Sequence, residues 1–143
     1  MGHINNDQIR IVNLYTTPLS ETQWTNFIFY HAYVIFYTET IRGRKYWWSL
    51  EKNGNALILQ MSSNLEDVRD NNEGERRIKK YTTHWRPRVQ KSDVAQISFR
   101  ALYNYLIVDK DQLNIKYNFA GGNCKKFAKL VFNRIALTEI WDY

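Results

Sequence analysis

Residues 121–135, GGNCKKFAKLVFNRI, place the single cysteine of the chain at the start of a predicted helix. Two glycines loosen the turn before it, and Asn123 is a good N-cap because its side-chain oxygen accepts a free amide of the first turn. Helical spacing then puts one set of side chains on a shared inward face, namely Cys124, Phe127, Ala128, Val131 and Ile135. The stretch predicts an amphipathic helix with a thiol in its first turn.

A thiol at that position feels the positive end of the helix dipole and the charges of Lys125 and Lys126. Both effects favour the thiolate, which is the nucleophilic form of cysteine. The alternative is that Cys124 is only the first core residue of the helix, because free cysteine is commonly buried as a small hydrophobe. A partner histidine would favour the catalytic interpretation.

The composition predicts a single domain over residues 1–143, with a core from about residue 8 to residue 137. One cysteine cannot form an internal disulfide, so a reducing, cytoplasmic compartment is expected. No apolar run approaches the roughly 20 residues that span a bilayer, so no transmembrane segment is expected. One cysteine and three scattered histidines lack the spacing that zinc requires, and we therefore expect no metal and no cofactor.

Alternating and β-branched patterns predict a strand over 8–16 and three further strands over 29–38, 45–52 and 56–61. Asn53-Gly54 between the last two is a strong hairpin signal. The last three strands would form an antiparallel meander. A short helix is expected within 20–28, a polar surface loop over 62–74, and a helix that starts at Ser92-Asp93.

The net charge of +6 is concentrated in residues 76–91, which carry seven basic residues and no acidic one. Tyr81 and Trp85 are interleaved with them, and basic residues mixed with aromatic ones suit phosphate contact and base stacking. The alternative is an ordinary solvated loop. The candidate binding residues are Arg76, Arg77, Lys79, Lys80, Trp85, Arg86 and Arg88.

His31 lies early in the predicted strand 29–38 and is the candidate base for Cys124. Cysteine catalysis needs a base within hydrogen-bond reach and a third group that orients the base. On the neighbouring strand, Ser49 and Glu51 share one face and are the nearest polar candidates for this role. Glu51 is chemically better because a carboxylate also stabilises the imidazolium. The alternative for His31 is a buried histidine that donates to a neighbour.

The order of these residues resembles the circularly permuted papain-like (NlpC-type) superfamily. An early Tyr30-His31-Ala32-Tyr33-Val34-Ile35 strand and a late Asn123-Cys124-Lys125-Lys126-Phe127 helix start are similar to those of three groups. These are the lecithin:retinol acyltransferase-like proteins, viral proteins with histidine and Asn-Cys motifs, and desumoylating isopeptidase-like proteins. The resemblance implies an α+β fold, with an antiparallel β-meander packed against helices and a catalytic-type cysteine at a helix N-terminus.

Two departures from the pattern bear on the site. Acyltransferase-like members show Asn-Cys-Glu-His-Phe where this chain has Asn-Cys-Lys-Lys-Phe, and their second-strand histidine falls here at Ser49. The lipid-directed members also carry a hydrophobic tail, which the sequence after Thr138 does not resemble.

The sequence thus predicts a thiol hydrolase, such as a thiol protease, or an acyltransferase acting on an amide, isopeptide or ester of a protein or lipid. Cys124 would form a thioester, with His31 as base and Glu51 or Ser49 as its orienting residue. The alternative is a non-catalytic module of the same fold that binds nucleic acid or an anionic surface through residues 76–91.

Overall fold

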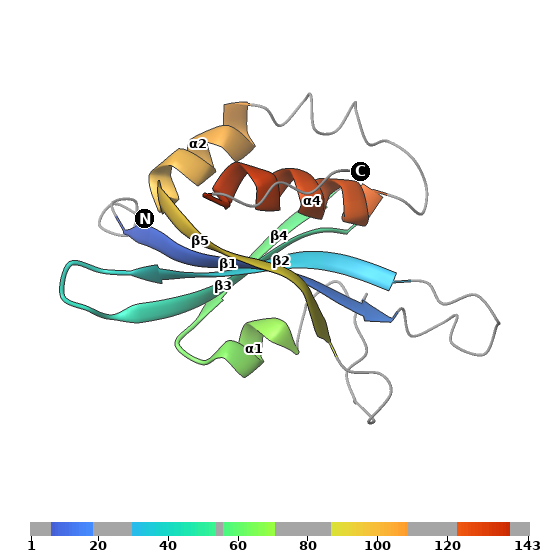
Figure 1. Ribbon diagram of the computed structural model, residues 1–143, viewed down its shortest axis with the longest axis horizontal. Coiled ribbons are helices and arrows are strands. Elements are labelled where there is room, and N and C mark those ends of the chain that lie inside the picture. The colour runs from blue at the N-terminus through green and yellow to red at the C-terminus, as the bar shows by residue number, and fades with distance from the viewer. Residues whose placement is uncertain (1–6, 19–29, 54–55, 71–86, 109–122, 138–143) are drawn as a thin grey trace.

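Five antiparallel strands form one sheet with the order β4-β3-β2-β1-β5 (Figure 1). The computed structural model describes residues 7–18, 30–53, 56–70, 87–108 and 123–137. Consecutive strands pair from β1 to β4, and β5 then joins the free side of β1. The strands are β1 (Gln8–Pro18), β2 (Tyr30–Glu39), β3 (Lys45–Asn53), β4 (Ala56–Ser62) and β5 (Arg88–Ser98).

Among the described residues, three helices cover the two faces of this sheet. Figure 1 shows α2 (Phe99–Val108) and α4 (Asn123–Ile135) together on one side, and the short α1 (Leu65–Arg69) on the other. β2 and β1 lie inside the sheet, between the edge strands β4 and β5. The inner strands therefore have a covered face on each side.

Alternation along β2 divides its side chains between the two faces. Ala32, Val34 and Phe36 are buried in the cluster that contains the inward residues of α4. Tyr33 and Ile35 are buried in a second cluster with Val68 of α1. Because both faces are buried, the strand reads as a nearly continuous apolar run and its register is fixed from both sides.

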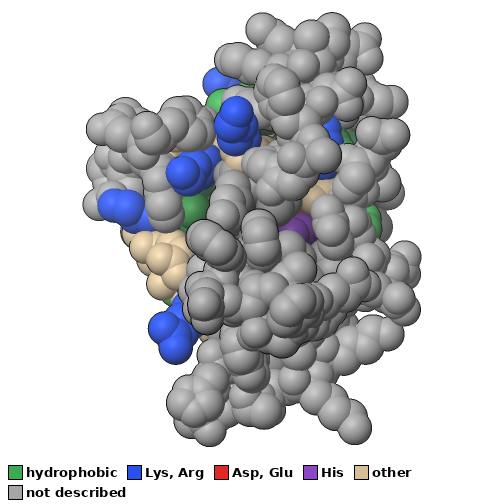
Figure 2. All heavy atoms as spheres, turned by 90° about the vertical axis from the view of Figure 1, so that its right-hand side faces the viewer, with side chains coloured by type: hydrophobic (Ala, Val, Ile, Leu, Met, Phe, Trp, Pro, Cys, Tyr) green, Lys and Arg blue, Asp and Glu red, His purple; other side chains and the backbone are tan. Residues whose placement is uncertain are grey.

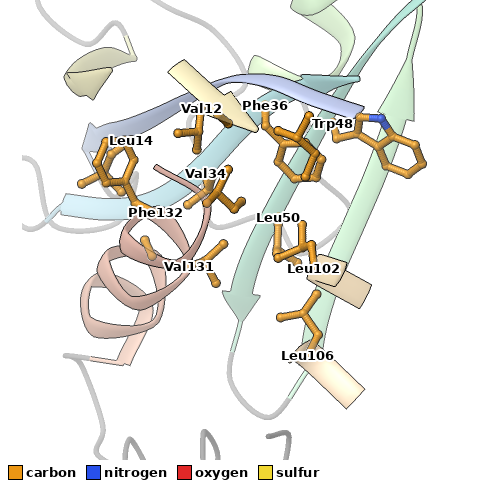
Figure 3. Packing of buried hydrophobic residues seen from close by; sticks show 14 of the residues in the cluster. Val12, Leu14, Val34, Phe36, Trp48, Leu50, Leu102, Leu106, Val131 and Phe132 are labelled. Atoms are coloured by element: carbon orange, nitrogen blue, oxygen red, sulfur yellow. The ribbon is translucent and has the colours of Figure 1, made fainter. Parts of the chain in front are cut away.

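The larger cluster is built from aromatic and aliphatic side chains of the sheet and the two long helices (Figure 3). Phe36 stacks on Trp48 with ring centroids 6.1 Å apart, and Trp48 lies 4.5 Å from the ring of Phe99 at the start of α2. Val131 and Phe132 of α4 are fully buried over the strands. This packing ties α2 and α4 to one face of the sheet.

The expected α+β, permuted papain-like architecture is wrong for the described residues. They form mostly antiparallel sheet, with few and short helices. Part of the difference is β5, because a helix was predicted from Ser92-Asp93 and a strand is found up to Ser98. The apolar spacing of this segment fits both periods, and the open side of β1 provides the backbone partners that decide for a strand.

Two further predictions concern the segments 62–74 and 20–28. The polar stretch 62–74 was predicted to be a loop, yet it contains α1, whose Val68 is buried against the sheet. One apolar residue per turn suffices for such a short helix when tertiary packing supports it. The helix predicted within 20–28 lies outside the described residues.

Candidate functional site

A histidine and a glutamate meet in the interior of the sheet, on the face that α1 covers. The Nε2 atom of His31 lies 3.3 Å from Oε2 of Glu51, and both side chains are completely buried. His31 is the second residue of β2, and Glu51 lies on the adjacent strand β3. Strand alternation brings both side chains to one face, since the β2–β3 register places Glu51 diagonally across from His31.

Tyr33 packs the pair against the sheet and links it to α1. Its ring stacks on His31 at 5.9 Å and on Tyr15 of β1 at 5.7 Å. Its hydroxyl donates a hydrogen bond of 2.9 Å to the backbone carbonyl of Arg69 at the end of α1. The histidine ring is therefore held by a row of aromatic side chains as well as by a carboxylate.

Two residues with hydroxyl groups neighbour His31 and Glu51 in the sheet. Ser49 is buried on the same face of β3 as Glu51, and Thr17 of β1 is the direct cross-strand partner of His31. Within the described part of the chain, neither hydroxyl oxygen has a hydrogen-bond partner. The sequence analysis missed Thr17 because Thr17-Pro18 reads as the end of a strand. Extending the alternation of β1 by one residue would have placed it beside His31.

The chemistry of the pair follows from its burial and its composition. A carboxylate beside an imidazole orients the ring and balances the charge of an imidazolium, which is the arrangement by which a histidine accepts and returns a proton. With Glu51 on the Nε2 side, Nδ1 is the ring nitrogen that would exchange a proton with a reacting group. A buried ion pair also serves a purely structural role in many proteins.

The structure does not bring α4 to the face on which His31 lies. α4 begins at Asn123, so Cys124 lies in its first turn, and the side chain of Cys124 lies outside what the structure describes. The buried residues of α4 pack on Ala32 and Val34, whereas His31 points to the opposite face of β2. Figure 1 shows α4 beginning above the end of the sheet where β2 begins. The first turn of α4 and His31 thus lie at the same end of the sheet, while the buried residues of α4 from Phe127 onward pack on the other face.

The predicted basic segment is described only from residue 87 onward. Arg88 is exposed at the start of the edge strand β5, and Lys91 follows on the same strand. The remaining candidates lie outside the described residues, namely Arg76, Arg77, Lys79, Lys80, Trp85 and Arg86. α4 carries four basic residues and no acidic one, and the sequence analysis considered its lysines only for their effect on Cys124.

Among the described residues no group of three or more His, Cys, Asp or Glu side chains is placed to hold a metal ion. No helix in this part of the chain is long and apolar enough to cross a membrane. No family model, curated protein or solved structure matches the chain. Functional inference therefore rests on the residues themselves.

Tyr15, at the far end of the aromatic row, gives the site a testable pH dependence. Burial raises the pKa of the Tyr15 phenol above its usual range, and the nearby Arg69 charge opposes part of that shift. The unfolded chain then loses this proton at lower pH than the folded protein. Folding stability should therefore decrease as the pH rises above about 10, the ordinary value for tyrosine.

The Tyr15→Phe variant should lose this part of the alkaline destabilisation. The measurement is urea unfolding between pH 8 and about pH 11 for the wild type, Tyr15→Phe and the control Tyr103→Phe, which alters an exposed phenol on α2. Equal slopes of stability against pH in the wild type and Tyr15→Phe would show that burial of Tyr15 does not perturb its titration.

Proposed function

We propose that the chain is a cysteine-dependent hydrolase or acyl-transfer enzyme in which His31 carries the proton and Glu51 orients His31. The observation that supports this proposal is the buried contact between His31 Nε2 and Glu51 Oε2. A base and an orienting carboxylate are two of the three groups that nucleophilic catalysis needs. The third, Cys124, is proposed from its place in the first turn of α4.

The reaction would proceed through a thioester. His31 takes the proton of the Cys124 thiol, the sulfur attacks the carbonyl carbon of an amide, isopeptide or ester, and the leaving group departs with that proton. Water or an acceptor alcohol or amine then attacks the thioester and restores the thiol. The backbone amide of Cys124 is a candidate donor to the oxyanion, since it is one of the free amides of the first helical turn.

The placement of α4 sets a condition on this mechanism. The residues of α4 after its first turn pack on the face opposite to His31. The mechanism requires the thiol of Cys124, in that first turn, to reach the imidazole of His31 at the start of β2. If the two groups meet, the rate at which Cys124 reacts with an alkylating reagent should depend on His31.

The rate of Cys124 alkylation by iodoacetamide tests the proposal, because the chain has one cysteine and the signal needs no assignment. Near neutral pH the wild-type rate should exceed that of His31→Phe and of Glu51→Gln by roughly tenfold or more, since a thiol without a base is only a few per cent thiolate. The matched control is Ser49→Ala, which removes a hydroxyl from the same face of β3 and should change the rate little.

Two results would end this proposal or modify it. Equal alkylation rates in the wild type and His31→Phe would retire the thiol mechanism and leave His31 and Glu51 as a structural pair. A large effect of Ser49→Ala with none of Glu51→Gln would transfer the orienting role to Ser49.

The second candidate function is a non-catalytic module that binds nucleic acid or another polyanion. The observation that favours it is the group of basic side chains at the end of the molecule where β5 begins. In the view of Figure 2, Lys and Arg side chains are spread over the described surface, and no Asp or Glu side chain of the described residues is visible. Exposed cations of this region include Arg88 on β5 and Lys126 on α4. Exposed basic side chains of this kind attract phosphates.

Binding of single-stranded RNA at increasing salt tests this second candidate. A variant with Arg86→Glu and Arg88→Glu should bind at least tenfold more weakly, and the salt dependence of its affinity should be shallower, because fewer counterions are released. The charge-matched control is Arg42→Glu with Arg44→Glu, in the hairpin turn at the other end of the sheet. Absence of wild-type binding at low salt would make this surface an ordinary solvated one.

A further inference from the structure

The turn between β2 and β3 presents the most exposed large apolar side chain of the described residues. Ile41 is 98% exposed, whereas the other exposed apolar side chains range from 37% to 52%. Figure 1 shows this hairpin extending beyond the rest of the sheet, at the end away from the first turn of α4. A single exposed isoleucine is common on protein surfaces. Ile41 differs because it lies in a hydrogen-bonded turn that also carries basic residues.

The turn that carries Ile41 is rigid. The amide of Gly43 donates to the carbonyl of Thr40 at 2.9 Å, and the amide of Thr40 donates to the carbonyl of Arg44 at the same distance. The amide of Arg44 also donates to the side-chain oxygen of Thr40 at 3.0 Å. Gly43 adopts a φ of +83°, the left-handed conformation that completes a short hairpin turn and that glycine adopts without strain. Ile41 is therefore held outward by the backbone.

Cations surround this apolar tip. Arg42, Arg44 and Lys45 are all exposed, and Glu39 at the base is the one acidic residue between positions 39 and 45. None of these three cations forms an ion pair within the described residues. The guanidinium of Arg44 instead lies 3.5 Å from the hydroxyl of Tyr46, and the ammonium of Lys45 lies 5.6 Å from the ring centre of Tyr37.

Aromatic side chains form the next layer of the hairpin. Tyr37 and Trp47 make an edge contact with ring centroids 5.1 Å apart, and both are only partly buried. Tyr46 is partly buried on the opposite face of the hairpin, against the larger core cluster. Along the hairpin, the order from the tip is thus an aliphatic side chain, then cations, then partly buried aromatic rings. Aliphatic groups enter the acyl boundary of a bilayer, basic side chains bind its phosphates, and Tyr and Trp are common at headgroup level, so this hairpin carries the kinds of side chain found at a bilayer interface.

We infer that the β2–β3 hairpin tip is a membrane-contact site, in which Ile41 inserts into the interface of an anionic bilayer while Arg42, Arg44 and Lys45 bind lipid phosphates. The aliphatic apex favours lipid over nucleic acid, because a base would stack on an aromatic ring and the rings here lie behind the cations. One inserted side chain and three charges give weak, reversible binding that depends on anionic lipid. The site is separate from the His31–Glu51 pair and does not depend on the proposed enzymatic activity.

Co-sedimentation with vesicles tests the inference on the full chain. The wild type should bind vesicles that contain phosphatidylserine and should not bind vesicles of phosphatidylcholine alone. Ile41→Asp should reduce the partition coefficient at least tenfold. Arg42→Gln with Arg44→Gln should reduce it by roughly 25-fold, since each basic residue near an anionic surface is worth about fivefold. The matched control is Val94→Ser, which removes an exposed apolar side chain on β5 and should change nothing.

Folding is not expected to interfere, because Ile41 makes no buried contact and surface substitutions of this kind change stability little. Equal thermal midpoints in the variants would verify that. The inference is overturned if Ile41→Asp binds phosphatidylserine vesicles as the wild type does, or if the wild type fails to bind them at low salt. It is also overturned if the tip variants lose affinity for single-stranded RNA and keep their affinity for vesicles, which would make the hairpin a nucleic-acid contact.

Discussion

The burial of β2 on both faces is the constraint on which the rest of the structure depends. An inner strand with two covered faces must place every side chain on the correct side, because a slip of one residue would exchange the two sets. On one side, Ala32, Val34 and Phe36 fill the interface with α2 and α4. On the other, Tyr33 and Ile35 pack with α1, and His31 lies in the same row. A polar histidine can occupy this row because Glu51 lies within ion-pair distance.

This division of the sheet also shapes the functional question. The helix that carries Cys124 belongs to one layer, and the candidate base belongs to the other. A thiol mechanism requires Cys124, in the first turn of α4, to meet His31 at the start of β2, whereas polyanion binding and membrane contact use exposed side chains. The three candidate functional sites are spatially separate. The His31–Glu51 pair is buried inside the protein. The β5 strand and α4 both begin at one end of the sheet, and the tip of the β2–β3 hairpin lies at the other end (Figure 1).

Sequence reasoning predicted the parts of the structure that depend on local pattern. The predicted strands 29–38, 45–52 and 56–61 correspond to β2, β3 and β4, because β-branched and aromatic runs and the Asn53-Gly54 turn are local signals. Alternation also placed Glu51 and His31 on faces that can meet. It did not predict β5, whose pairing with β1 joins residues far apart in the sequence. Nor did it predict that α4 packs opposite to His31, since the amphipathic pattern of a helix does not specify which face of a sheet it covers.

The most direct test of the central claim is a double-mutant cycle on the free energy of unfolding with His31→Phe and Glu51→Gln. Phenylalanine keeps the stacking on Tyr33, and glutamine keeps the shape of the glutamate, so the coupling free energy isolates the interaction of the two polar groups. A buried pair in contact predicts a coupling of about 1 kcal/mol or more, against a coupling near zero for the same histidine variant combined with Ser49→Ala. Additive effects of His31→Phe and Glu51→Gln, within about 0.3 to 0.5 kcal/mol, would contradict the pairing on which this account of β2 depends.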